Sequence, residues 1–205
     1  MNHSRSDEVA GFVLAGGRSS RMGRDKALLE IAGQPLVVRA ARCLEPLVAS
    51  VTIIGPPQVF APLGFPALAD VQAGLGPLGG ISAALRHTLS PWNVFLACDM
   101  PYIHRDWLAY LIGRALCSTA DVILPDSEAG PEPLCSLCHR RGGPAIDAAI
   151  ARGVRKVTEA LCILAVERIA AAESKPFDSE GLLFQNLNSI EDYEQARRRL
   201  EGNTV

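Results

Sequence analysis

The chain contains the stretch Val9-Ala10-Gly11-Phe12-Val13-Leu14-Ala15-Gly16-Gly17-Arg18-Ser19-Ser20-Arg21-Met22-Gly23-Arg24-Asp25-Lys26, in which a glycine-rich, cationic segment follows an apolar run. The apolar run, Val9 to Leu14, contains β-branched and aromatic residues and predicts a strand. The segment behind it has no apolar periodicity, which is typical of a loop. Its glycines let backbone N–H groups approach an anion closely, and Arg21 and Lys26 supply neutralising charge. The stretch therefore predicts a phosphate-binding loop directly after a strand.

This loop differs from two common nucleotide-binding motifs. It lacks the Gly-Lys-Ser/Thr ending of a P-loop, and it contains no G-x-G-x-x-G. We therefore predict a phosphate-binding loop of another kind.

Strand-like and helical patterns alternate along the rest of the chain. Strands are predicted over residues 9–14, 50–54, 93–97, 121–124, 134–138 and 163–167, and helices over 36–44, 81–88, 106–117, 144–151 and 190–200. Residues 172–181 have a loop-like composition. The alternation predicts an α/β fold: a single domain of three layers, α/β/α, with a mostly parallel sheet. In such folds ligands bind at the carboxyl ends of the strands.

The composition is that of one globular domain of 205 residues with a formal net charge of −2. That charge argues against non-specific binding to nucleic acid or to acidic membranes. The first seven residues are polar, so we expect a flexible tail rather than a signal peptide, and no apolar run approaches the roughly 18 residues of a membrane span. We therefore expect a cytoplasmic protein. Cys43, Cys98, Cys117 and Cys162 lie in apolar runs, which favours buried thiols over disulfides.

Asp99 is the strongest candidate for a metal ligand. It lies in Cys98-Asp99-Met100-Pro101, directly after the strand predicted over 93–97. Both this segment and the first loop follow strands, so we expect them to meet at one edge of the sheet. A carboxylate beside substrate phosphates is a typical Mg²⁺ site, with Asp99 as the metal ligand. The alternative is that Asp99 caps the helix that follows.

The run Gly74-Leu75-Gly76-Pro77-Leu78-Gly79 formally matches the dinucleotide-binding pattern G-x-G-x-x-G. A true fingerprint follows a strand immediately, whereas here the polar residues 70–73 intervene and Pro77 interrupts the motif. We therefore expect these glycines to shape a loop over a ligand. Asp70, which precedes the loop, is a candidate nucleotide contact or a turn-forming residue.

Cys135-Ser136-Leu137-Cys138-His139 matches the C-x-x-C-H pattern of haem attachment. Haem attachment needs an exported protein, and the apolar alternation here favours a strand with small thiols inside. We therefore predict a strand rather than a haem or metal site.

Asn186-Leu187-Asn188-Ser189 precedes the last predicted helix. In an extended segment, alternation places both amides on one side, where they can hydrogen-bond a polar ring or a phosphate. The alternative is that Asn188 or Ser189 only caps the helix.

These motifs together resemble the molybdenum cofactor guanylyltransferase family. The resemblance rests on the first loop, which is shared with other nucleoside-triphosphate transferases, and on Gly76-Pro77-Leu78-Gly79-Gly80, Cys98-Asp99-Met100-Pro101 and Asn186-Leu187-Asn188. It implies a Rossmann-like nucleotidyltransferase fold. It also implies transfer of GMP from GTP to molybdenum-carrying molybdopterin, with release of pyrophosphate. The partners that it implies are molybdoenzymes or other proteins of cofactor synthesis.

The resemblance also implies roles for individual residues. GTP contacts are implied at Leu14, Ala15, Gly16, Gly17, Lys26, Asp70 and Asp99, catalytic roles at Arg21, Lys26 and Asp99, Mg²⁺ binding at Asp99, and pterin-side contacts at Asn186 and Asn188. One departure concerns guanine recognition, because Gly55 stands where the family often has an asparagine.

Several other functions remain open from the sequence. The nearest is a cytidylyltransferase acting on the same cofactor, although Gly17 favours GTP because that sister group tends to have alanine there. A sugar- or polyol-phosphate nucleotidyltransferase, a non-catalytic nucleotide-binding protein and a dehydrogenase are the others.

Overall fold

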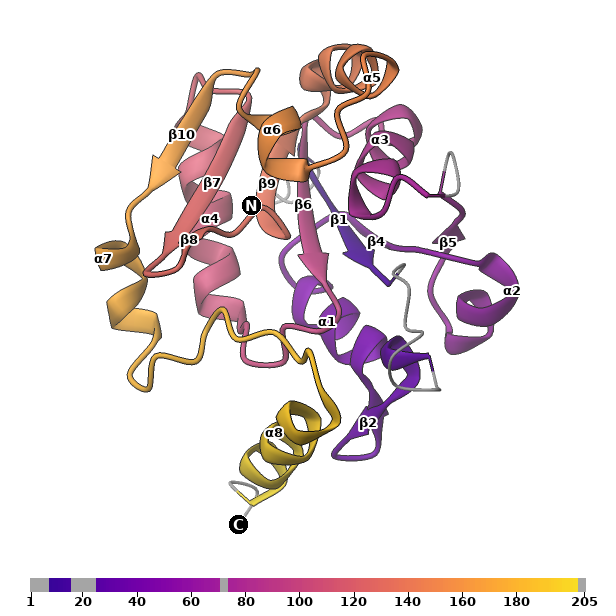
Figure 1. Ribbon diagram of the computed structural model, residues 1–205, viewed down its shortest axis with the longest axis vertical. Coiled ribbons are helices and arrows are strands. Elements are labelled where there is room, and N and C mark those ends of the chain that lie inside the picture. Colours follow the sequence, from indigo (N-terminus) through magenta and orange to yellow (C-terminus); the bar gives the residue numbers. More distant parts are fainter. Residues whose placement is uncertain (1–7, 16–24, 71–73, 203–205) are drawn as a thin grey trace, which may run out of the picture.

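A computed structural model describes residues 8–15, 25–70 and 74–202, and within them it forms a sheet covered by helices (Figure 1). The sheet consists of β1 (Val9–Leu14), β4 (Ser50–Ile54), β5 (Ala67–Leu68), β6 (Trp92–Ala97), β7 (Val122–Ser127), β8 (Gly130–Pro131), β9 (Cys135–His139) and β10 (Val166–Ile169). A separate hairpin pairs β2 (Glu30–Ile31) with β3 (Gln34–Pro35).

The α-helices are α1 (Leu36–Leu44), α2 (Pro57–Phe60), α3 (Pro77–His87), α4 (Arg105–Cys117), α5 (Gly143–Ala151), α6 (Val157–Leu161), α7 (Ala171–Ser174) and α8 (Ile190–Gly202). Short 3₁₀ turns are η3 (Lys26–Leu28), η4 (Ala61–Leu63), η5 (Arg140–Gly142) and η6 (Lys175–Phe177). The predicted single α/β domain is therefore confirmed.

The sheet is mostly parallel, as predicted. Its strand order is β10-β7-β9-β6-β1-β4-β5, with β8 paired to β7. β1 pairs in parallel with both β4 and β6, and β7 pairs in parallel with β10. β9 runs antiparallel to β6 and to β7. The carboxyl ends of β4, β1 and β6 consequently lie side by side at one edge.

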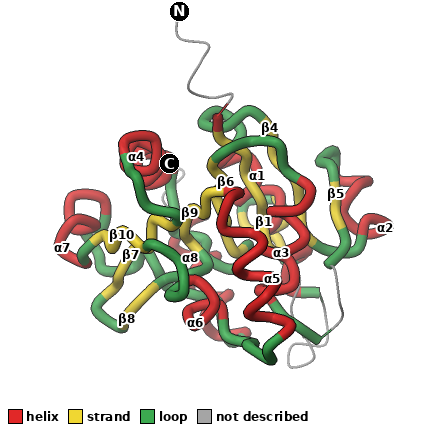
Figure 2. Tube along the Cα trace, turned by 90° about the horizontal axis from the view of Figure 1, so that it is seen from above, coloured by secondary structure: helices red, strands yellow, loops and turns green. Residues whose placement is uncertain are grey.

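The sheet separates two hydrophobic cores, and the helices that cover them lie on its two sides in Figure 2. On one face, Val37 and Leu44 of α1 pack with Trp107 and Leu111 of α4. On the other face, side chains of α3, α5 and α6 pack together, with Ile81, Ile146 and Leu161 among them. α8 lies apart from both cores and packs beside β2 (Figure 1), where Leu36 and Ala196 share a small cluster. These layers are those expected of an α/β/α domain.

Several predicted elements begin or end elsewhere than expected. α1 and β4 have the predicted bounds, whereas α3 begins at Pro77, four residues before the predicted start at 81. The reason is that Pro77 occupies the first helical position, which proline favours, after Gly76 with φ of 57°. β10 covers 166–169 rather than 163–167. α7 lies in the stretch predicted as loop, where the Glu173 carboxylate accepts a hydrogen bond from the Ala170 N–H (3.0 Å).

The cysteines are free thiols, but the prediction that they are buried is wrong for two of them. Cys117 and Cys162 are exposed, because they lie at helix ends on the solvent side, whereas Cys98 is buried and Cys43 is half-buried. In β9, Cys135 and Cys138 enter the cores on opposite faces of the sheet. Burial raises the pKa of both thiols to about 12. The predicted strand is confirmed, and because the two thiols lie on opposite faces of the sheet, they cannot both bind one metal ion.

Among the described helices, none has the length and apolar character needed to cross a lipid bilayer.

Candidate active site

The two predicted functional loops begin next to each other at the edge of the sheet. The N–H of Ala15, just after β1, donates to the Ile54 carbonyl at the end of β4 (3.0 Å). The Cys98 N–H, just after β6, donates to the Leu14 carbonyl (3.2 Å). The backbone of Leu14 and Ala15 is therefore hydrogen-bonded to the ends of both neighbouring strands, β4 and β6.

Lys26 and Asp99 form an ion pair across this edge. Lys26 Nζ lies 2.7 Å from Asp99 Oδ2, and the two side chains are 18% and 25% exposed. Lys26 is held at the start of η3, where the preceding Asp25 accepts a hydrogen bond from the Ala27 N–H (3.1 Å). The prediction that the two loops meet is thus confirmed for the residues that the structure describes.

Asp99 does not cap the helix that follows it. α4 begins at Arg105, and the residue before it is His104. The capping alternative for Asp99 is therefore wrong. Its Oδ1 accepts no hydrogen bond from residues 8–15, 25–70 or 74–202. This oxygen is available to a cation or to a hydrogen-bond donor of a ligand.

The segment before α8 docks onto Asp99 through its backbone. The Leu187 N–H donates to the Asp99 carbonyl oxygen (2.9 Å). The Leu187 side chain is buried against Leu36, whereas Asn186 is half-buried and Asn188 is exposed. Both asparagines are therefore sequence neighbours of the residue that binds the Asp99 carbonyl. This backbone contact was not predicted from the sequence. The one feature that could have indicated it is the apolar Leu187 between two asparagines, which suggests that this segment packs against the domain.

The segment also caps α8, so the capping alternative is correct for Ser189. Ser189 Oγ accepts a hydrogen bond from the Asp192 N–H (3.1 Å), and the Asp192 carboxylate accepts from the N–H groups of Asn188 and Ser189 (2.8 Å each). These backbone hydrogen bonds lower the pKa of Asp192. Asn188 takes part in the cap through its backbone N–H. Its side-chain amide has no partner within the described residues. The cap therefore fixes the segment without consuming this amide.

Asp70 lies against the start of α3, close to β1 and β4. A Cβ atom on Gly80 would lie 3.0 Å from Asp70 Oδ1, 2.7 Å from a methyl of Ile54 and 3.3 Å from a methyl of Leu14. A larger residue at position 80 would displace these groups, since real Cβ atoms do not approach others so closely. Burial raises the pKa of Asp70. The sequence analysis named Gly80 only as part of the Gly76–Gly80 motif and did not predict this steric role.

Gly55 has a structural reason for its departure from the family pattern. A Cβ atom at this position would lie 2.5 Å from the ring of Phe60, which is fully buried in α2. An asparagine cannot fit unless that ring moves. In this chain the side of the site after β4 is therefore formed without a side chain at position 55.

Gly16, Gly17 and Arg21 lie outside the described residues. In the part that is described, no three or more histidine, cysteine or acidic side chains are grouped to hold a metal ion. Any metal at Asp99 would consequently need further oxygen ligands from a substrate or from water.

A family model described as the MobA-like NTP transferase domain matches residues 11–166 of the chain. The chain belongs to this family. The matched range contains Lys26, Asp99 and most of the sheet. It ends before the segment that carries Asn186 and Asn188.

Relatives of this MobA-like domain are similar over nearly its whole length. A molybdenum cofactor guanylyltransferase from Syntrophotalea carbinolica is 30% identical over 191 residues, covering 93% of this chain and 91% of the relative. Another with the same name, from Serratia proteamaculans, is 32% identical over 192 residues, covering 91% and 92%. These matches extend over most of the C-terminal region outside the family model.

Solved structures give the same result for the fold. Molybdopterin-guanine dinucleotide biosynthesis protein A from Archaeoglobus fulgidus superimposes with a TM-score of 0.81 at 25% identity, covering 94% of this chain and 99% of the other. 2-C-methyl-D-erythritol 4-phosphate cytidylyltransferase from Thermus thermophilus superimposes with a TM-score of 0.70 at 15% identity, covering 95% and 99%. The second likeness shows the fold alone. The predicted nucleotidyltransferase fold is therefore confirmed, and the chain is a nucleotidyltransferase.

Proposed function

We propose that this chain transfers GMP from GTP to molybdopterin carrying molybdenum and releases pyrophosphate. The observation that carries the proposal is the convergence of Lys26, Asp99 and the Leu187 backbone at one edge of the sheet. Relatives named molybdenum cofactor guanylyltransferase match 93% and 91% of this chain. Those names favour GTP over CTP and favour the cofactor over a sugar or polyol phosphate.

The nucleotide occupies the side of the site formed by the first loop. Backbone N–H groups of Gly16 and Gly17, together with Arg21 and Lys26, hold the β- and γ-phosphates of GTP. Leu14, Ala15 and Asp70 contact the rest of the nucleotide. Since Lys26 pairs with Asp99 in the ligand-free protein, an incoming phosphate competes with that carboxylate for the ammonium group.

The reaction needs positioning and charge neutralisation more than acid–base chemistry. A terminal phosphate of the acceptor attacks the α-phosphorus of GTP in line, and the bond to the β-phosphate oxygen breaks. The nucleophile is already anionic, so it needs no strong general base. Lys26 and Arg21 stabilise the negative charge that develops on the leaving pyrophosphate. Asp99 and the amides hold the two reacting groups in line.

The Asp99 carboxylate fits a magnesium ion. One of its oxygens accepts no hydrogen bond from the described part of the chain, and a single carboxylate combined with substrate phosphates is a common Mg²⁺ arrangement. When bound there, Mg²⁺ would draw electron density from the α-phosphoryl oxygens. Lys26, which pairs with the same carboxylate, would contact the phosphates.

The acceptor occupies the other side, next to the C-terminal segment. Asn186 and Asn188 offer amides to the pterin ring or to its phosphate. A cavity of about 770 Å³ begins at Gln185, two residues before Leu187, and lies between the β7–β8 turn and residues 171–185. Its volume falls within the range of small-molecule sites, about 300–1,000 Å³. This cavity would hold the body of the acceptor.

Pyrophosphate release by the purified protein tests the proposal. We expect release with GTP, Mg²⁺ and molybdenum-carrying molybdopterin together, and none when the acceptor is left out. A preference for CTP would contradict guanylyl transfer. Nucleotide binding without release would identify a non-catalytic binding protein.

A further inference from the structure

A second cavity, of about 460 Å³, lies on the α1 and α4 side of the molecule. Gln34 and residues of α1 line one side of it, and the first turn of α4 lines another. Cys98, Met100 and Pro101, which surround Asp99 in sequence, line it as well. The cavity thus borders the segment that carries Asp99, but its lining does not include Asp99, Lys26 or Asn186. It is therefore distinct from the nucleotide and acceptor sites proposed above.

Three arginines line this cavity: Arg39 and Arg42 of α1 and Arg105 of α4. Asp106 is the one carboxylate among the lining residues, and it forms no ion pair with any of the three within the described part of the chain. Arg105 donates a long hydrogen bond to the Arg42 carbonyl (3.4 Å). In a chain with a formal net charge of −2, three arginines and one carboxylate give the described lining of this cavity a local excess of positive charge.

Arg39 is the most informative of the three. Its Nε is buried and has no hydrogen-bond partner in the described residues. Leaving a buried donor of a charged group without a partner is costly, and native structures generally satisfy such groups. Burial accordingly lowers the pKa of Arg39, and the neighbouring Cys43 offsets this only in part. Because the Arg39 side chain lines the cavity, an anion there would stabilise its guanidinium charge.

The first turn of α4 adds further donors. α4 has 13 residues and begins after His104, which provides no side-chain cap. His104 Nε2 instead interacts with the Phe177 carbonyl (2.8 Å). N–H groups of a first helical turn carry partial positive charge and favour anions, and Asp106 in the same turn offsets this only in part.

The remaining wall is apolar. Leu36, Leu96, Met100 and Ile103 are buried side chains that line the same space. The volume exceeds what an inorganic oxyanion needs and fits the lower range of small-molecule pockets, about 300–1,000 Å³. The lining therefore matches a ligand with an anionic head and an apolar or aromatic body.

We propose that this cavity, lined by Arg39, Arg42, Arg105 and the first turn of α4, is a binding site for a small organic phosphate monoester, separate from the nucleotide site. Guanidinium groups recognise a phosphate through several charge-assisted hydrogen bonds, and a dianion gains more than a carboxylate from three of them. The apolar wall holds the body of the ligand.

Calorimetric titration with phenyl phosphate, in the absence of nucleotide, tests this site. The wild-type protein should bind the probe, and Arg39→Met should weaken binding by at least about tenfold, since a charge-assisted hydrogen bond is lost. Arg42→Gln and Arg105→Gln change exposed side chains, so they keep the fold and should weaken binding as well. Benzoate, a monoanion of similar body, should bind more weakly.

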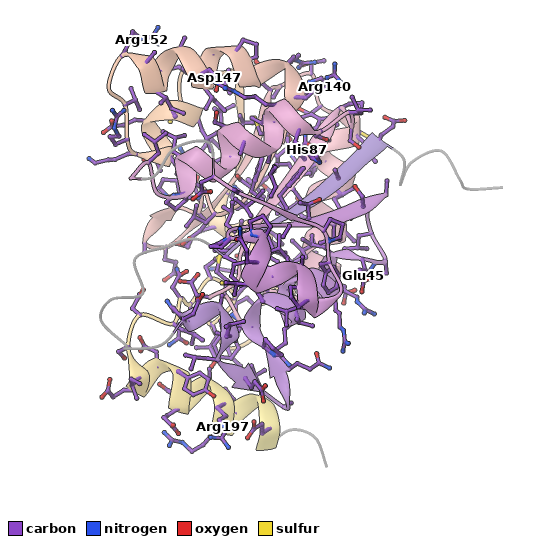
Figure 3. The ribbon with its side chains drawn as sticks, turned by 90° about the vertical axis from the view of Figure 1, so that its right-hand side faces the viewer. Glu45, His87, Arg140, Asp147, Arg152 and Arg197 are labelled. Carbon is purple, nitrogen blue, oxygen red and sulfur yellow. The ribbon has the colours of Figure 1, made fainter. Side chains whose placement is uncertain are left out.

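Two controls separate this site from others. Arg152→Met should bind the probe normally, because Arg152 follows α5 and lies on the other side of the sheet from α1. Figure 3 labels Arg152 and also Glu45, which follows α1. Lys26→Ala should also bind normally. Loss of binding in Lys26→Ala rather than in the arginine variants would place the probe in the candidate active site and overturn the proposal. Equal binding of benzoate would overturn the assignment to phosphate.

The stability of the ligand-free protein provides a second readout. A guanidinium kept for a ligand costs free energy when the ligand is absent, so Arg39→Met should leave the melting temperature unchanged or raise it. A clear fall in melting temperature, together with unchanged phenyl phosphate binding in Arg42→Gln, would show that Arg39 has a structural role only.

Discussion

Two charged clusters in this protein differ in how completely their members satisfy one another. Lys26 and Asp99, at the ends of β1 and β6, form a pair in which one carboxylate oxygen has no donor from the described chain. Arg114 of α4 instead donates to Glu167, Glu173 and Tyr110 at distances of 2.6 to 3.0 Å. Ser118 Oγ donates to the second Glu167 oxygen (2.5 Å).

The difference indicates different roles. The Arg114 cluster ties α4 to β10 and to α7, and its polar groups are used within the protein. The Lys26–Asp99 pair leaves capacity for a ligand at the edge of the sheet. Asp147 of α5, labelled in Figure 3, accepts a hydrogen bond from Ser82 (2.6 Å) and forms an ion pair with Arg86 (2.9 Å), both of α3. These contacts resemble the Arg114 cluster, since they tie two helices together. Saturation of hydrogen bonds therefore separates structural from functional charges here.

Asp99→Asn should produce the largest effect. It keeps the shape of the side chain but removes the charge that pairs with Lys26 and that would hold a cation. We expect pyrophosphate release to fall by about 10²–10³-fold or more, as for loss of a main electrostatic contact. The circular dichroism spectrum and melting temperature should change little. Release at the wild-type rate in Mg²⁺ would contradict the role of Asp99.

Lys26→Ala should have the next largest effect. It removes one charge-assisted contact to the phosphates, worth about 1.5–3 kcal/mol. We therefore expect kcat/KM for GTP to fall by about 10- to 150-fold. Steady-state kinetics with varied GTP would measure this, and an unchanged kcat/KM would show that Lys26 does not contact the nucleotide.

Arg114→Met should affect stability rather than catalysis. The side chain is about one-third exposed (36%), so solvent screens the cluster, and we expect a loss of about 1–2 kcal/mol. Thermal unfolding should show a lower Tm, with Arg152→Met as the matched arginine control. The kcat/KM of the variant for GTP, measured below its Tm, should equal that of the wild type. A kinetic defect comparable to that of Lys26→Ala would remove the distinction between the clusters.

Glu173 should give the smallest effect, a change in acid sensitivity. Hydrogen bonds from the Tyr110 hydroxyl, the Ala170 N–H and Arg114 lower its pKa below the unfolded value of 4.5. A lowered folded pKa stabilises the protein above pH 4.5, and this stabilisation is lost as the pH falls through the folded pKa. The Tm difference between wild type and Glu173→Gln should therefore be larger at pH 7 than at pH 3. A constant difference would contradict the role of the charge.

The parallel part of the sheet could be predicted from the sequence because its strands are apolar runs that end in glycine, proline or aspartate. Val9–Leu14 and Ser50–Ile54 have the predicted bounds for this reason. β10 and α7 were harder to predict. β10 is half-exposed and lacks a clear alternation, and α7 depends on Glu173 reaching back to Ala170. Such contacts are tertiary or local details that hydrophobic periodicity does not record.

The candidate site was predictable to the same extent. The meeting of Lys26 with Asp99 followed from the rule that parallel strand ends share an edge. The contact of Leu187 with Asp99 could not follow from it, because it joins a segment outside the sheet to the strand edge. The steric role of Gly80 and the ring of Phe60 beside Gly55 likewise depend on packing between elements.

The hydrogen bond between Leu187 and Asp99 also has a consequence during synthesis of the chain. Lys26 and Asp99 are synthesised before Leu187, which lies 88 residues after Asp99 in the sequence. At translation rates of about 5–20 residues per second, that interval lasts about 4–18 s. Throughout it, a nascent chain carries the phosphate-binding half of the site without the half that would receive the acceptor. A polypeptide that ends before residue 187 would therefore keep the proposed GTP-binding residues but lack the segment proposed to bind the acceptor.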